Sequence, residues 1–74
     1  MKESFVRRQP RDFFNDKKAI VLVEQSNIGG ETISKDDIVT ITGKNTIYKT
    51  CLNIRSSSGV EIYRVSCEYL ELIK

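Results

Sequence analysis

Short runs of β-branched and aliphatic residues, each ended by turn-forming residues, are the feature that most constrains the fold of this chain. They predict five strands, over residues 19–23, 38–42, 46–54, 60–65 and 70–73. The first run is continuously apolar, which is typical of a strand covered on both faces. The second alternates, so that Val39 and Ile41 share one face. The pattern indicates an all-β protein.

The segments between these runs indicate how the strands connect. Residues 24–37 form a long first loop with a turn at residues 27–30, residues 43–45 interrupt the sheet, and residues 56–59 form a tight hairpin. Residues 66–69 form one short turn before the last strand. Five short strands with one long loop are too few for a sandwich, but they can curl into a small barrel without exposed edges. Because 74 residues build one core, we predict a five-stranded barrel over residues 17–74, preceded by an N-terminal arm over residues 1–16.

The arm carries most of the positive charge. The chain has a net charge of +2, and residues 1–18 contain six Lys or Arg against three acidic residues. Pro10 disfavours a helical conformation at Gln9, which excludes a long helix here, although Pro10 suits the start of a short helical turn. Phe13 and Phe14 are the strongly apolar pair of the arm, and we expect them to pin it to the barrel.

Alternation within the strands, together with the family resemblance described in the next paragraph, indicates the core. The expected core residues are Ile20, Leu22, Ile33, Val39, Ile41, Leu52, Val65, Leu70 and Leu72.

Two stretches resemble the SH3-like family of small barrels, which includes KOW-type domains. Residues 31–41 (ETISKDDIVTI) are similar to the family's apolar residue, polar turn ending in Asp and alternating strand. Residues 65–73 (VSCEYLELI) are similar to its valine, one-turn 3₁₀ segment with a tyrosine, and last strand. The resemblance implies that residues 24–37, 43–45 and 56–59 are the RT loop, the n-Src loop and the distal hairpin. Small barrels of this kind occur among phage-encoded proteins and among partners of ribosomes and of transcription.

The departures from the family argue against recognition of proline-rich peptides. The peptide-binding members have an Ala-Leu-Tyr-Asp-Tyr run and a tryptophan, whose rings form the grooves for a polyproline helix. This chain has no tryptophan, and its first strand reads Ala-Ile-Val-Leu-Val. Of the groove aromatics, only Tyr69 is at a matching position.

The residue types of this chain argue against catalysis. The chain has no histidine, so neither a Ser-His nor a Cys-His pair can form. The pair Asp36-Asp37 is typical of a turn, and Gly29-Gly30 lacks the Lys-Ser/Thr and the helix of a phosphate-binding loop. We therefore expect no enzymatic activity and no cofactor.

The cysteines and the hydropathy bear on metals and compartment. Cys51 and Cys67 cannot supply a four-ligand metal site without histidine. With no signal peptide expected, we predict free thiols and a reducing cytoplasm, that of a host cell if the protein is phage-encoded. A disulfide would require their Cα atoms to lie within about 7 Å. No apolar run reaches membrane-spanning length, so no membrane partner is expected.

Two binding functions remain. Both faces of the strands over residues 46–54 and 60–65 carry apolar groups, more than a small interior needs, which favours a protein partner, with this protein as an adaptor or inhibitor. The surplus could instead be covered by the arm. The alternative function is RNA or DNA binding through the basic arm, although acidic residues dilute the field. The candidate binding residues for these functions are Arg7, Arg8, Arg11, Lys17, Lys18, Tyr48, Lys49, Tyr63 and Tyr69.

Overall fold

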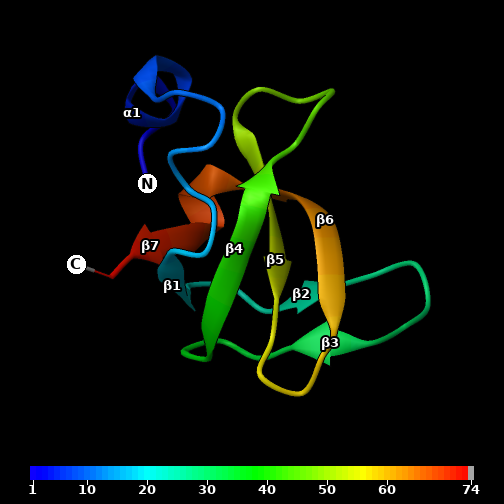
Figure 1. The fold of residues 1–74 in the computed structure, drawn as a ribbon. Helices are drawn as coiled ribbons and strands as arrows, with labels where there is room; N and C mark the ends of the chain where they lie inside the picture. The colour runs from blue at the N-terminus through cyan, green and yellow to red at the C-terminus, as the bar shows by residue number, and fades with distance from the viewer. Residues whose placement is uncertain (74) are drawn as a thin grey trace.

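The computed structural model describes residues 1–73, and β-strands are its main secondary structure (Figure 1). In chain order the elements are α1 (Glu3–Arg8), β1 (Lys18–Val21), β2 (Gln25–Ser26), β3 (Thr32–Ile33), β4 (Ile38–Lys44), β5 (Cys51–Arg55), β6 (Glu61–Ser66), the 3₁₀ helix η1 (Cys67–Tyr69) and β7 (Leu70–Leu72). The prediction of an all-β protein with a five-stranded sheet is confirmed.

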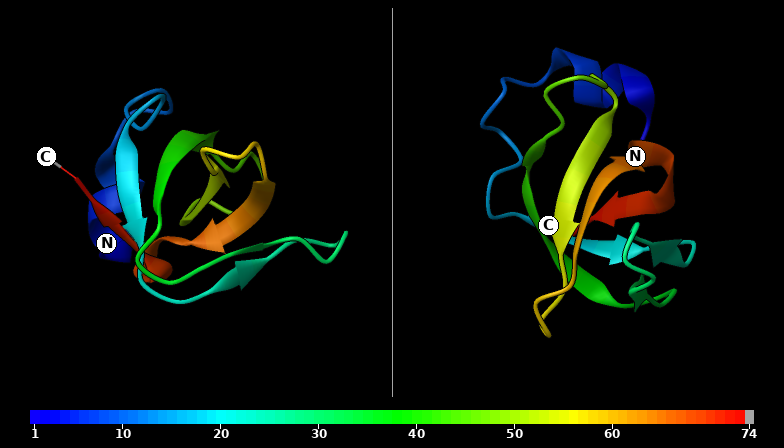
Figure 2. Two further views of the ribbon diagram at one scale, coloured as in Figure 1. Left: turned by 90° about the horizontal axis from the view of Figure 1, so that it is seen from below. Right: turned by 90° about the vertical axis from the view of Figure 1, so that its right-hand side faces the viewer.

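The main sheet has the strand order β6-β5-β4-β1-β7, and all of its neighbouring strands are antiparallel. The sheet curls strongly, as the two views of Figure 2 show. It does not close into a barrel, because β6 and β7 are its two edges and do not pair with each other. The β2–β3 hairpin forms a separate two-stranded sheet whose β2 contacts β6. Closure of the five strands, which the turn pattern predicted, is therefore wrong.

The region between β4 and β5 differs most from the predicted strands. β4 continues through Gly43 to Lys44, beyond the expected break, and residues 46–50 form a loop instead of a strand. The side chain of Asn45 explains this change, because its Oδ1 atom accepts hydrogen bonds from the backbone N–H groups of Ile47 (2.9 Å) and Tyr48 (3.0 Å). These bonds satisfy donors that a strand would have paired with a neighbour.

The core contains most of the predicted residues, but the inner and outer faces of the first strand are exchanged relative to the prediction. Ile33, Val39, Ile41, Leu52, Val65 and Leu70 are buried, and Leu72 is partly buried. Ile20 and Leu22 are only half-buried, because Ala19 and Val21 occupy the inner face of β1. A continuous apolar run does not reveal which alternate residues face inward, and a shift of one residue exchanges the two faces.

A bulge in β6 places its apolar residues on one side of the sheet. Leu52 of β5 lies opposite Val65 and Ile54 lies opposite Ile62, so that Tyr63 and Arg64 together face a single β5 residue. Arg64 has a φ of 62°. Both Ile62 and Val65 are consequently buried, whereas strict alternation had put them on opposite faces. Part of the expected apolar surplus is thus absorbed by the interior.

The N-terminal arm absorbs more of that surplus. Val6 of α1 and Phe14 are fully buried in the same core as the sheet residues, and the rings of Phe5 and Phe13 pack edge-on against Phe14. The expectation that the Phe13-Phe14 pair pins the arm is confirmed. The helix α1 ends before Pro10, and a hydrogen-bonded turn starts at Pro10, whose carbonyl accepts from the N–H of Phe13 (3.1 Å); further turns follow to residue 17.

Candidate functional site

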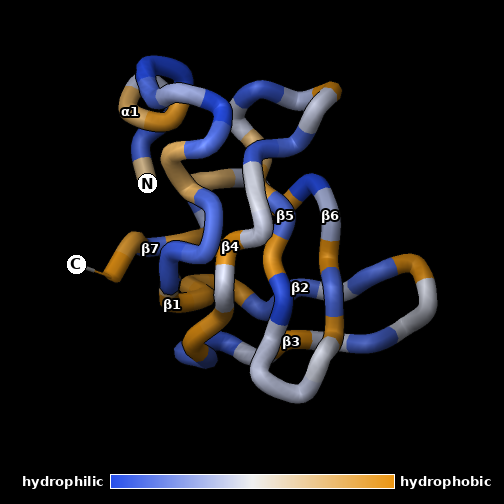
Figure 3. Tube along the Cα trace, viewed as in Figure 1, coloured by the Kyte–Doolittle hydropathy of each residue, from blue (hydrophilic) through white to orange (hydrophobic). Residues whose placement is uncertain are grey.

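A groove of about 780 Å³ lies between the β2–β3 hairpin and the 45–50 loop and crosses β6. Three large apolar side chains along it are exposed: Ile28 of the hairpin (103%), Ile47 of the loop (75%) and Tyr63 of β6 (61%). In Figure 3, the orange of hydrophobic residues marks the tip of the β2–β3 hairpin and the tip of the loop between β4 and β5. Water-exposed apolar side chains of this size that gather along one groove are typical of interaction sites.

Asn27 holds the hairpin wall of the groove in place. Its backbone N–H donates to the carbonyl of Glu31 (2.9 Å), and its side-chain oxygen accepts from the N–H of Glu31 (2.9 Å). The side-chain amide of Asn27 also donates to the carbonyl of Glu61 in β6 (3.2 Å). The turn that carries the exposed Ile28 is thereby tied to the floor of the groove.

Asn53 of β5 holds the opposite wall. Its side-chain oxygen accepts from the side-chain amide of Asn45 (3.1 Å) and from the backbone N–H of Arg64 (3.2 Å). Its backbone carbonyl accepts from the hydroxyl of Thr42 (3.2 Å). One residue therefore joins β4, the start of the 45–50 loop and the β6 bulge.

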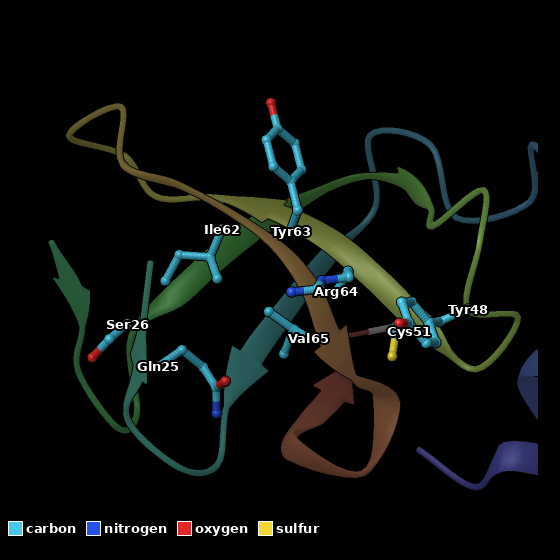
Figure 4. A pocket seen from close by; sticks show the side chains of 8 residues that line it. All are labelled: Gln25, Ser26, Tyr48, Cys51, Ile62, Tyr63, Arg64 and Val65. Atoms are coloured by element: carbon cyan, nitrogen blue, oxygen red, sulfur yellow. The ribbon is translucent and has the colours of Figure 1, made fainter. Parts of the chain in front are cut away.

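Beside the groove, a smaller cavity of about 360 Å³ opens where β2 approaches β6 (Figure 4). The guanidinium of Arg64 lies over the ring of Tyr48, 5.4 Å from its centroid, a cation–π contact. Tyr63 points away from the other labelled side chains in Figure 4. Cys51 also lines this cavity, and burial raises the pKa of its thiol, which the nearby charge of Arg64 partly offsets. A raised pKa makes a thiol a weaker nucleophile at neutral pH.

A third cavity, of about 310 Å³, is basic. Arg11, Lys44 and Lys49 line it together with Asn45 and Thr46. The ammonium of Lys44 donates to the carbonyls of Val6 (2.9 Å) and Gln9 (3.1 Å) at the end of α1. This contact joins the arm to the end of β4, directly before the 45–50 loop.

The structure brings some of the predicted binding residues together and separates others. Tyr48 and Tyr63 share the smaller cavity, Arg11 and Lys49 share the basic one, and Tyr63 also lines the groove. The predicted residues that line none of these three cavities are Arg7, Arg8, Lys17, Lys18 and Tyr69.

Two of these five residues make contacts of their own. Lys17 lies over the ring of Phe13 at 4.7 Å, and Lys18 donates to the hydroxyl of Thr40. Those contacts hold both lysines against the fold.

The sequence-based reading missed Ile28 and Ile47. Each lies among turn-forming or polar residues, Ile28 within Asn-Ile-Gly-Gly and Ile47 within Asn-Thr-Ile-Tyr-Lys. For Ile28, an isoleucine inside a predicted turn, where the chain must stay at the surface, was the available signal. Ile47 gave no such signal, because it lay within the predicted strand 46–54.

Metal and membrane features complete the description. Within residues 1–73, no group of three or more His, Cys, Asp or Glu side chains is arranged to hold a metal ion. Over the same range, no helix has the length and apolar character needed to cross a bilayer. Cys51 and Cys67 are free thiols, the latter buried.

No protein-family model, curated protein or solved structure matches this chain. The geometry of the groove and the basic cavity therefore carries the functional argument.

Proposed function

We propose that this protein is a non-enzymatic module that binds another protein through the groove between the β2–β3 hairpin and the 45–50 loop. The observation that carries the proposal is the alignment of Ile28, Ile47 and Tyr63, all exposed, along one groove of about 780 Å³. Burying one such side chain against a partner is worth about 1.5–3 kcal/mol before the costs of association. Three of them provide a centre for a protein interface.

The walls of the groove support this function because they are fixed before a partner arrives. Asn27 ties the hairpin to Glu61, and Asn53 ties the loop to the bulge. A site that is already ordered loses less conformational entropy on binding. The exposed isoleucines therefore remain presented to solvent at defined positions.

We further propose that the fold is an open member of the SH3-like class. The strand order β6-β5-β4-β1-β7, the long first connection and the one-turn η1 before the last strand support this assignment. Among the groove-lining side chains the aromatic one is Tyr63, and the large apolar side chains on the two walls are those of Ile28 and Ile47. That composition fits an apolar segment of a partner better than a polyproline helix, which docks between aromatic rings.

RNA or DNA binding through the arm is the weaker alternative. Phe14 is fully buried and Phe13 packs against the core, so this pair is taken up by the fold and is not presented to stack on bases. Arg7 and Arg8 are exposed on α1 and do not line the cavity that holds Arg11. The two phenylalanine rings of the arm are thus not available beside its cations for base stacking.

A pull-down with matched variants tests the proposal. The tagged protein is compared with an Ile28→Ser/Ile47→Ser variant, and with Ile38→Ser as the control, since Ile38 is 57% exposed but does not line the groove. All three are incubated with bacterial lysate with and without nuclease and analysed by mass spectrometry. We expect one partner that survives nuclease, is lost with the double variant and is kept by the control. Partners that vanish on nuclease treatment, or that the double variant retains, would overturn the proposal.

A further inference from the structure

We propose that the basic cavity of Arg11, Lys44 and Lys49 binds an acidic side chain, Asp or Glu, of the protein that occupies the groove. This inference rests on the proposed function and names the chemistry of the partner. The cavity measures about 310 Å³, and its five lining residues include three cations and no carboxylate. Such a concentration of one charge at a cavity favours an anionic group there.

Lys44 supplies a fixed positive charge at this cavity. Its ammonium is held by the carbonyls of Val6 and Gln9, and neither acceptor is a carboxylate. An ammonium has three donors, so two carbonyl contacts leave one for a ligand. Its charge is thereby positioned by the fold but not neutralised by these partners.

Arg11 and Lys49 complete the cavity from two different segments. Arg11 follows Pro10 in the arm, which is anchored on both sides, by the Lys44 contact to Gln9 and by the buried Phe14. Lys49 lies in the 45–50 loop, whose start is fixed by the Asn45–Asn53 contact. A guanidinium can accept a carboxylate in a bidentate arrangement, and an ammonium can add a third contact.

The position of the cavity favours a protein ligand. Asn45 and Thr46 line both the basic cavity and the apolar groove, so the two are continuous around one loop. A partner segment with apolar side chains in the groove would therefore bring its next residues to Arg11 and Lys49. The cavity lining contains no aromatic ring, which a site for single-stranded nucleic acid uses for base stacking.

A selection from a displayed library of random twelve-residue peptides tests both the proposed protein-binding groove and the proposed acid-binding cavity. The wild-type protein is compared with an Arg11→Gln/Lys49→Gln variant, and with Lys35→Gln/Arg55→Gln as a control. The two control residues are exposed and line neither the cavity nor the groove, and their replacement removes the same amount of positive charge. Lys44 is left unchanged because it also holds α1.

We expect wild-type and control proteins to select peptides with an apolar cluster near an Asp or Glu, and the Arg11→Gln/Lys49→Gln variant to keep only the apolar cluster. For a synthetic selected peptide, replacing that acid by its amide should raise the Kd about three- to tenfold for the wild type, and hardly at all for the cavity variant. Apolar selection without an acidic residue would overturn the inference and leave the proposed function standing. No apolar selection would overturn both.

A second titration covers the competing ligand. Fluorescence anisotropy with labelled twelve-residue dT and U oligonucleotides is measured for the same three proteins at about 0.15 M salt. We expect no difference between the cavity variant and the control. Oligonucleotide binding that weakens tenfold in the cavity variant alone would assign the cavity to phosphates instead of an acidic side chain.

Discussion

The side-chain amide of Asn45 donates a hydrogen bond of 3.1 Å to the side-chain oxygen of Asn53. The same oxygen of Asn53 accepts from the N–H of Arg64 at 3.2 Å. Asn45 in turn accepts from the N–H groups of Ile47 and Tyr48. This pair of asparagines therefore connects the loop that presents Ile47 with the bulge that presents Tyr63, and it fixes one wall of the groove to the floor formed by β6.

Replacing Asn53 tests the importance of that connection for stability. Asn53→Ala leaves the N–H of Arg64 and the amide of Asn45 without their acceptor, and it should lower the free energy of unfolding by about 1–2 kcal/mol. Asn53→Asp keeps an acceptor and should lose less. Urea denaturation monitored by circular dichroism measures both. Equal losses for the two variants would show that the shared acceptor does not matter.

The β6 bulge gives a prediction about backbone conformation. Arg64 has a φ of 62°, a region that β-branched residues strongly disfavour. Arg64→Val should therefore destabilise the protein by about 1–3 kcal/mol. In Arg64→Gly, relief of backbone strain offsets the lost contact with Tyr48, so its stability should stay within about 1 kcal/mol of the wild type. Thermal melts of the two variants decide the matter, and a valine variant as stable as the glycine one would contradict the bulge.

We expect the arm and the sheet to unfold together, so that loss of a buried arm side chain destabilises the whole domain. Phe14 is fully buried, so Phe14→Ala removes a ring from the core and should lower the free energy of unfolding by about 3–5 kcal/mol. That amount approaches the whole stability of a domain of this size. Phe13→Ala is the matched control, because Phe13 is only partly buried and should cost less. If Phe14→Ala melts like the wild type, the arm does not belong to the core.

Two isoleucines of the β2–β3 hairpin, Ile28 in its turn and Ile33 in β3, distinguish the site from the core. Ile33 is 2% exposed, and Ile33→Asp should unfold the protein because a buried, unpaired carboxylate costs several kcal/mol. Ile28 is fully exposed, and Ile28→Asp should leave the melting temperature almost unchanged. A folded Ile33→Asp variant would mean that the hairpin does not pack as described.

The thiols should differ in reactivity. Burial raises the pKa of both Cys51 and Cys67, so each has less thiolate in the folded chain than in the unfolded chain at the same pH. At pH about 8, iodoacetamide should modify the half-buried Cys51 more slowly than it does in urea, and the buried Cys67 only as the chain unfolds. Mass spectrometry of the digested protein measures each site. Modification of Cys67 as fast as Cys51 in the native state would contradict its burial.

Part of the fold followed from local pattern. The all-β class, the reversal at residues 56–59, the one-turn segment before β7 and six buried core residues were predicted because alternation and turn residues act between near neighbours. The inner face of β1 was not predicted, because either set of alternate residues in a continuous apolar run can face the core. The pairing of Ala19 with Val39 and Leu72 decides which set does.

The site was predictable only in part for the same reason. Tyr48, Tyr63, Arg11 and Lys49 were identified as candidate residues by their type, yet only the fold shows which of them share a cavity. Ile28 and Ile47 became visible as groove residues once the hairpin and the loop were placed across β6.

The sequence by itself thus determined that the chain forms short antiparallel strands around an aliphatic core, since those preferences are local. The tertiary structure decided that the arm enters the core and that β6 bulges at Arg64. It also decided that the groove with three exposed apolar side chains adjoins the basic cavity at Asn45 and Thr46. These features depend on contacts between residues far apart in the chain, such as Lys44 with Val6 and Asn27 with Glu61. Such contacts exist only after the strands have packed.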